Sequence, residues 1–438
     1  MKDGHSGREN GNIAEYVAAL KASEKLGPQV TSHTVLPERG ASFSSVARPW
    51  PRAMGDVLGE LGIPSLYSHQ AEAVDALRAG KDVVVATPTA SGKSLVYTLP
   101  VLERCLHDPD AKALFLFPLK ALAQDQLASF TAMTAHWPED ARPRAAIYDG
   151  DTSPHFRRKI RENPPAVLFT NPEMLHLSLL PHHHLWATLF AGLSFVVVDE
   201  VHTYRGVLGS HMAQVFRRMR RIASLYGSSP AFAFCSATVG NPAELAGRLT
   251  GTDPLPVLQS GAPQGKRHYV FMNPLESPAS AAIKLLKSAL RRNLRTIVYC
   301  QSRRMTELIG LWVSEQSGPY AGRISAYRAG FLPEERRKIE ARMASGELLA
   351  VISTSALELG IDIGSLDLCI LVGYPGTVMA TLQRGGRVGR SSQESAVVLI
   401  AQEDALDQHF IRHAEDFFSR PPEKAEINPE NPVILERH

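Results

Sequence analysis

The sequence predicts an α/β protein built from two parallel-sheet domains, and three observations support this prediction. Short apolar runs rich in Val, Ile, Leu and Phe recur along the chain, and segments of helical pattern separate them. Such runs suit strands buried on both faces, as in parallel sheets, and the helical segments supply the crossovers. A Gly-, Pro- and Ser-rich stretch between residues 251 and 280 interrupts the alternation and indicates a linker.

The apolar runs give the expected strands and domain boundaries. Strands are expected at 83–87, 113–118, 166–170, 195–200 and 231–237, and again at 296–301, 323–327, 349–353, 368–373 and 396–401. The expected domain plan is an N-terminal extension at 1–59, a first domain at 60–255, a linker at 256–275, a second domain at 276–420 and a peripheral C-terminal tail at 421–438.

Composition places the chain among ordinary globular proteins. Of the 438 residues, 44% are hydrophobic and 21% are charged, and the net charge is +3. This charge is too small to identify a nucleic-acid partner and does not exclude one. The four Cys are widely spaced without a C-x-x-C pair, so neither a zinc site nor a disulfide framework is indicated. With no signal-peptide core and no long apolar run, a cytoplasmic location is expected.

Residues 87–94, TPTASGKS, form the most informative motif. An apolar strand precedes them and a helical segment follows. In this arrangement backbone N–H groups and the helix N-terminus face phosphates, the Lys93 amine reaches the outer phosphates, and the Ser94 hydroxyl ligates magnesium. Thr87 stands where the general pattern has its first Gly. On the motif alone, the alternative is a strand-to-helix turn with a solvated lysine.

Two further segments point to phosphate chemistry. In VVVDEVH at 196–202, an apolar strand ends in two carboxylates. Asp199 suits contact with magnesium, and Glu200 suits the orientation and deprotonation of an attacking water. In QRGGRVGR at 383–390, arginines separated by glycines suit bidentate phosphate binding. Taken singly, a helix-capping acidic pair and a basic surface turn are the alternatives.

Together these segments resemble the motor core of superfamily 2 helicases of the DEAD/DEAH-box type. The resemblance runs from about 60 to 415, with the motifs in the family order. It implies two tandem RecA-like domains with an inter-domain ATP cleft, and ATP and Mg²⁺ as cofactors. The family tolerates Thr at the position of Thr87. The matching segments are 67–70, 87–94, 118–126, 170–173, 199–202, 236–238, 298–303, 354–362 and 383–390.

The resemblance also implies a role for each matched residue. The catalytic residues implied are Lys93, Asp199, Glu200, Gln383, Arg387 and Arg390, with Ser94 and Asp199 as metal ligands. The nucleotide-binding residues implied are Tyr67, Gln70, Thr87, Pro88, Thr89, Ala90, Ser91, Gly92, Lys93, Ser94, Gly360 and Asp362. The nucleic-acid contacts implied are Lys120, Thr170, Asn171, Ser302, Arg303, Arg328, Thr354 and Ser355, and the coupling residues are His202, Ser236 and Thr238.

A narrower resemblance concerns residues 199–211, DEVHTYRGVLGSH. This stretch is similar to DNA-repair helicases of the bacterial mitomycin-repair type and their fungal RecQ4-like relatives. Those relatives move 3′ to 5′ on single-stranded DNA and carry a zinc-binding C-terminal region with clustered Cys. The sequence shows no such cluster, so we hypothesise that it is a motor core cut from a longer protein.

The sequence therefore predicts an ATP-dependent DNA helicase or translocase that acts in DNA repair. Its expected partner is single-stranded DNA or a tailed duplex, and its expected location is cytoplasmic and nucleoid-associated. An RNA helicase is the first alternative, against which His202 in place of Asp and the Tyr204-Arg205-Gly206 continuation argue. A clamp that binds nucleic acid and ATP without turnover is the second.

Overall fold

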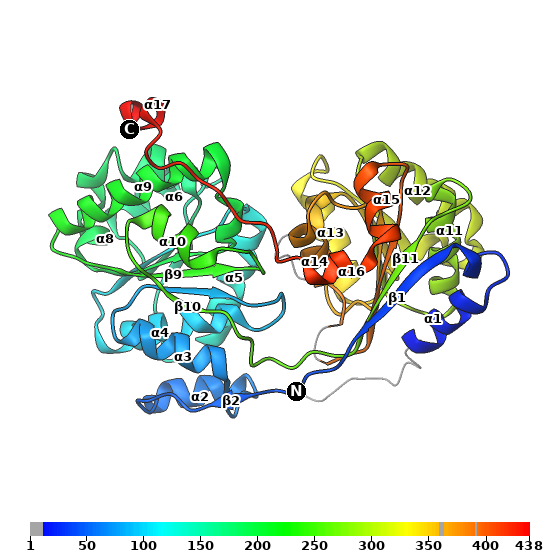
Figure 1. Ribbon diagram of the computed structural model, residues 1–438. Coiled ribbons are helices and arrows are strands. Elements are labelled where there is room, and N and C mark those ends of the chain that lie inside the picture. The colour runs from blue at the N-terminus through cyan, green and yellow to red at the C-terminus, as the bar shows by residue number, and fades with distance from the viewer. Residues whose placement is uncertain (1–11, 359–362, 390–391) are drawn as a thin grey trace. The chain divides into compact units, whose positions relative to one another are not determined.

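The computed structural model describes residues 12–358, 363–389 and 392–438, which form two compact domains. Domain 1 comprises Ala41–Ala262 and Glu423–His438. Domain 2 comprises the segment that ends at Gly40 and Pro263–Pro422. Each domain is a mostly parallel sheet covered by helices, as the sequence predicts (Figure 1). No helix in the described part of the chain combines the length and apolar character that a membrane crossing needs.

The sheet of domain 1 has the strand order β10-β4-β9-β8-β5-β7-β6, and all its pairings are parallel. Helices α3 and α4 lie on one side of it, and α9 and α10 on the other (Figure 1). Its strands are β4 Val83–Ala86, β5 Lys112–Leu116, β6 Ala145–Ile147, β7 Val167–Thr170, β8 Leu193–Val198, β9 Ala231–Ser236 and β10 Leu255–Val257. Two further strands, β2 Phe43–Ser44 and β3 Leu66–Tyr67, form a separate antiparallel pair. The α-helices are α2 Arg52–Glu60, α3 Ser68–Arg78, α4 Lys93–His107, α5 Lys120–Met133, α6 Pro154–Glu162, α7 Pro172–Met174, α8 Ala187–Ala191, α9 Gly206–Leu225, α10 Pro242–Thr250 and α17 Pro432–Arg437.

Alternate residues of these strands explain why both faces of the sheet are covered. Val83 and Val85 belong to the core cluster that also contains residues of α3 and α4. Val84, between them, points to the opposite face and is also fully buried. Burial of one such side chain contributes roughly 1.5–3 kcal/mol, so a strand with apolar residues at every position is stable only between two helical layers.

The sheet of domain 2 has the order β1-β11-β16-β15-β12-β14-β13, in which β1 alone is antiparallel to its neighbour. The strands are β1 Val30–Leu36, β11 Arg267–Met272, β12 Thr296–Cys300, β13 Ile324–Tyr327, β14 Ala350–Ser353, β15 Leu368–Val372 and β16 Ser395–Ile400. The α-helices are α1 Ile13–Ala22, α11 Pro278–Arg291, α12 Arg303–Gln316, α13 Pro333–Ala344, α14 Val378–Gly385, α15 Ala405–Arg412 and α16 Ala414–Ser419. Every strand expected from the apolar runs is present, with ends shifted by at most two residues.

The N-terminal extension differs from the expectation that it feeds the first domain. Residues 12–40 pack on domain 2, where β1 extends the sheet beside β11 (Figure 1). Ile13, Tyr16, Val17 and Leu20 of α1 enter the domain 2 core. Their spacing of three and four residues puts them on one face of the helix, which explains the docking.

The expected linker and tail also differ from the structure. The stretch 256–275 contains most of β10 and all of β11, so it belongs to both sheets, and the chain leaves domain 1 after Ala262. The C-terminal segment packs on domain 1, where the Gly206 amide donates to the Glu426 carbonyl at 2.7 Å. Ala425 and Ile427 are buried there. Their alternation with charged residues is the pattern of an extended segment with one buried face.

Candidate nucleotide-binding site

The loop 87–92 connects the carboxyl end of β4 to the first residue of α4. Gly92 is the N-cap of α4 and has a left-handed backbone, with φ of 75°. A Cβ at this position would lie 2.5 Å from Nε2 of Gln70, so the glycine is needed for both space and conformation. The turn exposes the amino end of α4, where unpaired N–H groups attract an anion.

Two hydroxyl groups hold the loop closed from inside. Oγ1 of Thr87 lies 2.7 Å from Oγ of Ser91, and both residues are buried. A glycine at position 87 would supply no hydroxyl for this bond. The departure from the general motif therefore has a structural role in this chain.

The Lys93 side chain folds back over the same loop. Its Nζ donates to the carbonyl oxygens of Thr87 at 2.8 Å and Pro88 at 2.9 Å. These acceptors are neutral, and a phosphate oxygen with its full negative charge would compete well for the ammonium group.

Gln70 braces the loop from α3. Its Oε1 accepts from the Tyr67 amide at 3.0 Å, and its Nε2 donates to the Gly92 carbonyl at 2.9 Å. The adenine-binding role expected for Tyr67 and Gln70 stays a prediction. In the same loop, Thr89 is partly exposed and Ala90 is exposed with a positive φ of 63°. Ser94, in the first turn of α4, is partly exposed.

The acidic pair follows β8, two strands away from β4 on the same edge of the sheet. Oδ1 of Asp199 accepts from the Glu200 amide at 2.9 Å, and Glu200 has the unusual φ of 50° for a non-glycine residue. Burial and the neighbouring Glu200 carboxylate raise the pKa of Asp199 to about 7, while the positive charge of Lys93 opposes the rise. The two motifs therefore act on each other electrostatically within domain 1.

These oxygen donors suit Mg²⁺, which binds proteins through one or two carboxylates and keeps water and phosphate oxygens as its other ligands. Asp199 and Ser94 would hold the ion, whose charge would offset that of the phosphates and favour the ionised form of Asp199. No group of three His, Cys, Asp or Glu suited to a metal occurs among the residues that the structure describes. Such a group is not needed for a magnesium nucleotide.

Two of the three expected coupling residues lie in contact. Nδ1 of His202 is 3.3 Å from Oγ of Ser236 and 3.5 Å from Oε2 of Glu200. Burial lowers the pKa of His202, which favours the neutral ring. Thr238 is partly exposed, two residues beyond Ser236 at the end of β9. The histidine thus joins the acidic pair to the neighbouring strand.

In domain 2, the predicted residue Arg387 and its neighbour Arg384 both contact Glu358, which was not among the predicted site residues. Nη2 of Arg387 donates to the Glu358 carbonyl at 2.6 Å, and Nε of Arg384 donates to the Glu358 carboxylate at 3.0 Å. Arg387 and Gln383 are buried, with 2% and 6% of their surfaces exposed. Glu358 lies inside the matched segment 354–362, but nothing in the sequence indicated that it would contact these arginines. Gly360, Asp362 and Arg390 lie outside the described residues.

The residues of domain 1 that are expected to contact nucleic acid differ in their exposure and in their present partners. Lys120 is exposed and forms an ion pair with Asp151 at 2.7 Å, and Asn171 caps α7. Thr170 is buried and its hydroxyl donates to the Tyr148 carbonyl at 2.6 Å, and its expected contact with nucleic acid stays a prediction. As the last residue of β7, its side chain is enclosed by the fold.

The nucleic-acid residues expected in domain 2 gather at one sheet edge. They follow β12, β13 and β14, which are neighbours in the sheet. Ser302 caps α12, Arg303 is exposed, and Arg328 pairs with Glu307 at 3.0 Å. Thr354 and Ser355 come directly after β14. The structure therefore brings these residues together along the carboxyl ends of adjacent strands.

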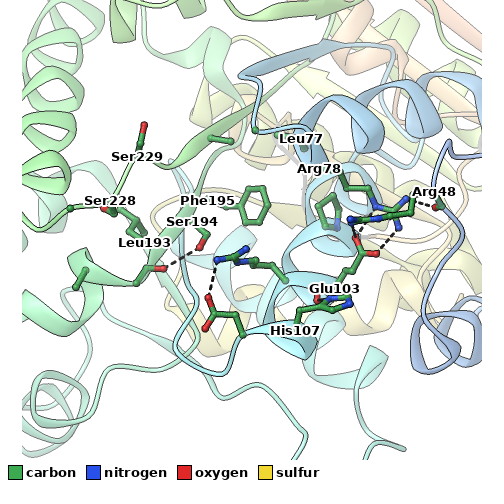
Figure 2. A pocket seen from close by; sticks show the side chains of 18 residues that line it. Arg48, Leu77, Arg78, Glu103, His107, Leu193, Ser194, Phe195, Ser228 and Ser229 are labelled. Atoms are coloured by element: carbon green, nitrogen blue, oxygen red, sulfur yellow. Dashed lines mark hydrogen bonds and ion pairs between the residues drawn. The ribbon is translucent and has the colours of Figure 1, made fainter.

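A hollow of about 630 Å³ lies at the other edge of the domain 1 sheet, where Leu193 and Ala231 begin their strands. Figure 2 shows Arg48 and Arg78 converging on Glu103 in this hollow. Nε of Arg78 lies 2.7 Å from Oε2 of Glu103, whose side chain is 4% exposed. These charged groups are engaged with one another, and the hollow is remote from the phosphate loop along the strands.

Comparison with known proteins identifies the family. A DEAD/DEAH box helicase model matches residues 67–245, and a model of the helicase conserved C-terminal domain matches residues 279–392. These matches follow the two sheets in order. The chain belongs to the DEAD/DEAH-box helicases of superfamily 2, and the family predicted from the sequence is confirmed.

Three individual helicases are similar to nearly the whole of this chain. The "Uncharacterized ATP-dependent helicase YprA" of Bacillus subtilis is 42% identical over 98% of this chain and 58% of that protein. The "ATP-dependent helicase HRQ1" of Saccharomyces cerevisiae is 36% identical over 92% of this chain and 39% of that protein. The crystal structure of the DUF1998 helicase MrfA bound to DNA and AMPPNP matches with a TM-score of 0.90 and 42% identity, over 96% of this chain and 60% of that one. The chain thus spans less than two thirds of each relative.

Proposed function

We propose that this chain is an ATP-dependent DNA helicase or translocase motor that moves 3′ to 5′ on single-stranded DNA and serves DNA repair. One observation carries the ATPase part of the proposal. The Lys93 loop and the Asp199–Glu200 pair lie at the same edge of one sheet, close enough for the lysine charge to act on the Asp199 carboxyl group. A cation, hard oxygen ligands and a second carboxylate in one place suit the hydrolysis of a magnesium nucleotide.

Each residue then has a distinct task. Lys93 and the amino end of α4 would bind the β- and γ-phosphates, and Asp199 and Ser94 would hold the magnesium ion. Glu200 would orient a water molecule and take its proton as the water attacks the γ-phosphorus, while the bond from that phosphorus to the bridging oxygen breaks and ADP leaves. Arg387 and Arg390 of domain 2 would supply further positive charge, and Gln383 an uncharged amide hydrogen-bond donor. Because DNA contacts at strand ends involve the phosphodiester backbone, the motor is expected to read no sequence.

DNA as the substrate rests on the relatives. MrfA was crystallised bound to DNA, and both it and HRQ1 resemble nearly the whole of this chain. The test is ATP hydrolysis by the chain with single-stranded DNA and with RNA of matched length. We expect DNA to stimulate turnover; stimulation by RNA alone would show an RNA helicase, and nucleotide binding without turnover would show a clamp.

Polarity and repair need separate experiments. Strand displacement from duplexes with a single 3′ or 5′ tail tests polarity, and we expect activity on the 3′-tailed duplex. Loss of the gene should reduce survival after treatment with a DNA-crosslinking agent. Displacement of 5′-tailed duplexes alone contradicts the polarity without affecting the assignment as a motor.

A further inference from the structure

His69 joins the phosphate loop to the segment by which the chain leaves domain 1. The residue is fully buried near the start of α3. The Gly261 amide donates to its Nδ1 at 3.1 Å, so the ring proton resides on Nε2, which donates to the Ser91 carbonyl at 3.0 Å. Both ring nitrogens are therefore used, one on the phosphate loop and one on Gly261.

Gly261 lies one residue before Ala262, where the domain 1 segment ends. Its carbonyl accepts from the amide of Ser42, at the place where the chain enters domain 1, with a distance of 2.8 Å. The carbonyl of Ser42 in turn accepts from the Ser68 amide at 2.8 Å. The two crossing segments, 40–42 and 261–264, are thus held together beside His69.

The backbone of Gly261 is closely packed against Ser42 and Ser68. A Cβ on Gly261 would lie 2.3 Å from Oγ of Ser68 and 2.6 Å from the Ser42 carbonyl. On the domain 2 side, Arg39 and Gln264 exchange two backbone hydrogen bonds of 2.8 and 2.9 Å. Ser91, the His69 ring, Gly261 and Ser42 therefore form a continuous chain of hydrogen bonds.

We propose that His69 is a positioning residue that couples nucleotide binding in the phosphate loop to the crossing segments between the domains. This inference rests on the proposed ATPase function. When the loop closes on phosphate, the Ser91 carbonyl moves, His69 follows it, and Gly261 shifts together with Ser42. The same path in reverse lets a domain movement driven by nucleic acid adjust the loop.

Two near-isosteric variants each break one link. In His69→Gln, the amide reaches the position of Nε2, so the donor to Ser91 is kept and the acceptor for Gly261 is lost. In His69→Asn, the amide oxygen replaces Nδ1, so the acceptor for Gly261 is kept and the donor to Ser91 is lost. His183→Gln is the matched control, because Nδ1 of His183 bonds to the Tyr226 hydroxyl at 2.9 Å elsewhere in domain 1.

The readout is the ratio of DNA-stimulated to basal ATP turnover. A variant that merely folds less well lowers both rates by the same factor and leaves the ratio unchanged. Coupling predicts that both His69 variants lower the ratio at least about fivefold, the lower end of typical coupling between sites. His183→Gln should retain the wild-type ratio. If His69→Gln also retains it, His69 only braces the loop and the proposal is overturned.

Amide hydrogen exchange separates this inference from the proposed function. In the wild-type chain, a non-hydrolysable ATP analogue should change exchange across 261–264, and His69→Gln should abolish that change. If the wild type binds the analogue and hydrolyses ATP without any change at 261–264, the coupling fails and the ATPase stands. If the analogue does not bind at all, the ATPase assignment fails first and the coupling with it.

Discussion

The hydroxyl groups of Thr87 and Ser91 lie 2.7 Å apart inside the phosphate loop. Both side chains are buried, so neither hydroxyl can turn to water if the other is removed. A buried hydroxyl left without a partner costs roughly 1–3 kcal/mol. The threonine that departs from the general motif is therefore a stabilising part of this loop.

Thr87→Gly, which would restore the general motif, is expected to weaken the protein. It removes the bond to Ser91, leaves that hydroxyl unpaired and adds backbone freedom, for a loss of about 1–3 kcal/mol in the free energy of unfolding. The KM for ATP should rise several-fold because the loop is less ordered. Urea unfolding and steady-state kinetics measure both effects. Thr87→Ser keeps the hydroxyl and should stay near wild type; equal behaviour of the two variants would contradict this role.

Lys93→Ala is expected to lower ATP turnover by at least about 100-fold, because it removes the charge that stabilises the transferring phosphoryl group. The fold should persist, since the amine donates to carbonyl oxygens of its own loop, those of Thr87 and Pro88, and contributes nothing to the domain 1 core. Steady-state ATP turnover measures the loss of activity, and a thermal melt measures whether the fold persists. Lys81→Ala, an exposed lysine before β4, is the control and should hydrolyse ATP normally. Turnover near wild type in Lys93→Ala would remove the lysine from the site.

The parallel strands could be predicted from the sequence because each carries its own local signal, an apolar run buried on both faces. β1 could not, because its sequence VTSHTVL is largely polar and partly exposed, and its partner β11 lies more than two hundred residues away. Because β1 was not predicted, the packing of the N-terminal segment on domain 2 was not predicted either. Pairing at this range leaves no periodic trace in a single sequence.

The sequence singles out candidate site residues where a motif fixes both residue type and spacing, as at Lys93 and Asp199, and the structure places these two at the same edge of one sheet. His69 and Glu358 lie inside the matched segments 67–70 and 354–362, but neither was assigned a site role. His69 contacts backbone atoms of Ser91 and Gly261, and Glu358 accepts hydrogen bonds from the side chains of Arg387 and Arg384. Such partners depend on the tertiary arrangement. Thr170 shows that a residue at a motif position can also have its side chain turned into the fold, which a single sequence does not reveal.

Ser236→Ala should separate ATP hydrolysis from strand separation. The change removes the hydroxyl 3.3 Å from Nδ1 of His202 and leaves the acidic pair intact. We expect about a fivefold drop in base pairs opened per ATP, within the usual range of coupling energies. Parallel ATPase and strand-displacement assays give this ratio. Ser194→Ala removes a hydroxyl at the other edge of the same sheet and should leave the ratio unchanged; a normal ratio in Ser236→Ala would exclude the coupling role.

His69 predicts an acid sensitivity of domain 1. Burial, helped by the charge of Lys93 and opposed by the bond to Ser91, lowers the pKa of His69 from its ordinary 6.5 to about 4. Because the unfolded chain then binds the proton more tightly, stability is fully present above pH 6.5 and declines as the pH falls towards 4. Between pH 7.5 and 5 this amounts to about 2 kcal/mol.

The measurement is urea unfolding at both pH values, followed by tryptophan fluorescence, since Trp50, Trp137 and Trp186 lie in domain 1. His69→Gln carries no titrating group and should lose about 2 kcal/mol less than the wild type over the same interval. Identical pH dependence in the two proteins would show that His69 titrates normally.

The C-terminal segment depends on a glycine of α9 for its docking. A Cβ on Gly209 would lie 2.3 Å from the Tyr204 carbonyl oxygen and 2.4 Å from Cγ2 of Ile427. Gly209→Ala should therefore destabilise domain 1 by about 2 kcal/mol, as overpacking of a core does, and should expose 423–438 to proteolysis. Gly55→Ala is the matched helical control, because its Cβ meets nothing within 4 Å. It should stabilise the protein by about 0.5–1 kcal/mol. If both variants gain stability and resist protease alike, Ile427 does not pack against Gly209 in solution.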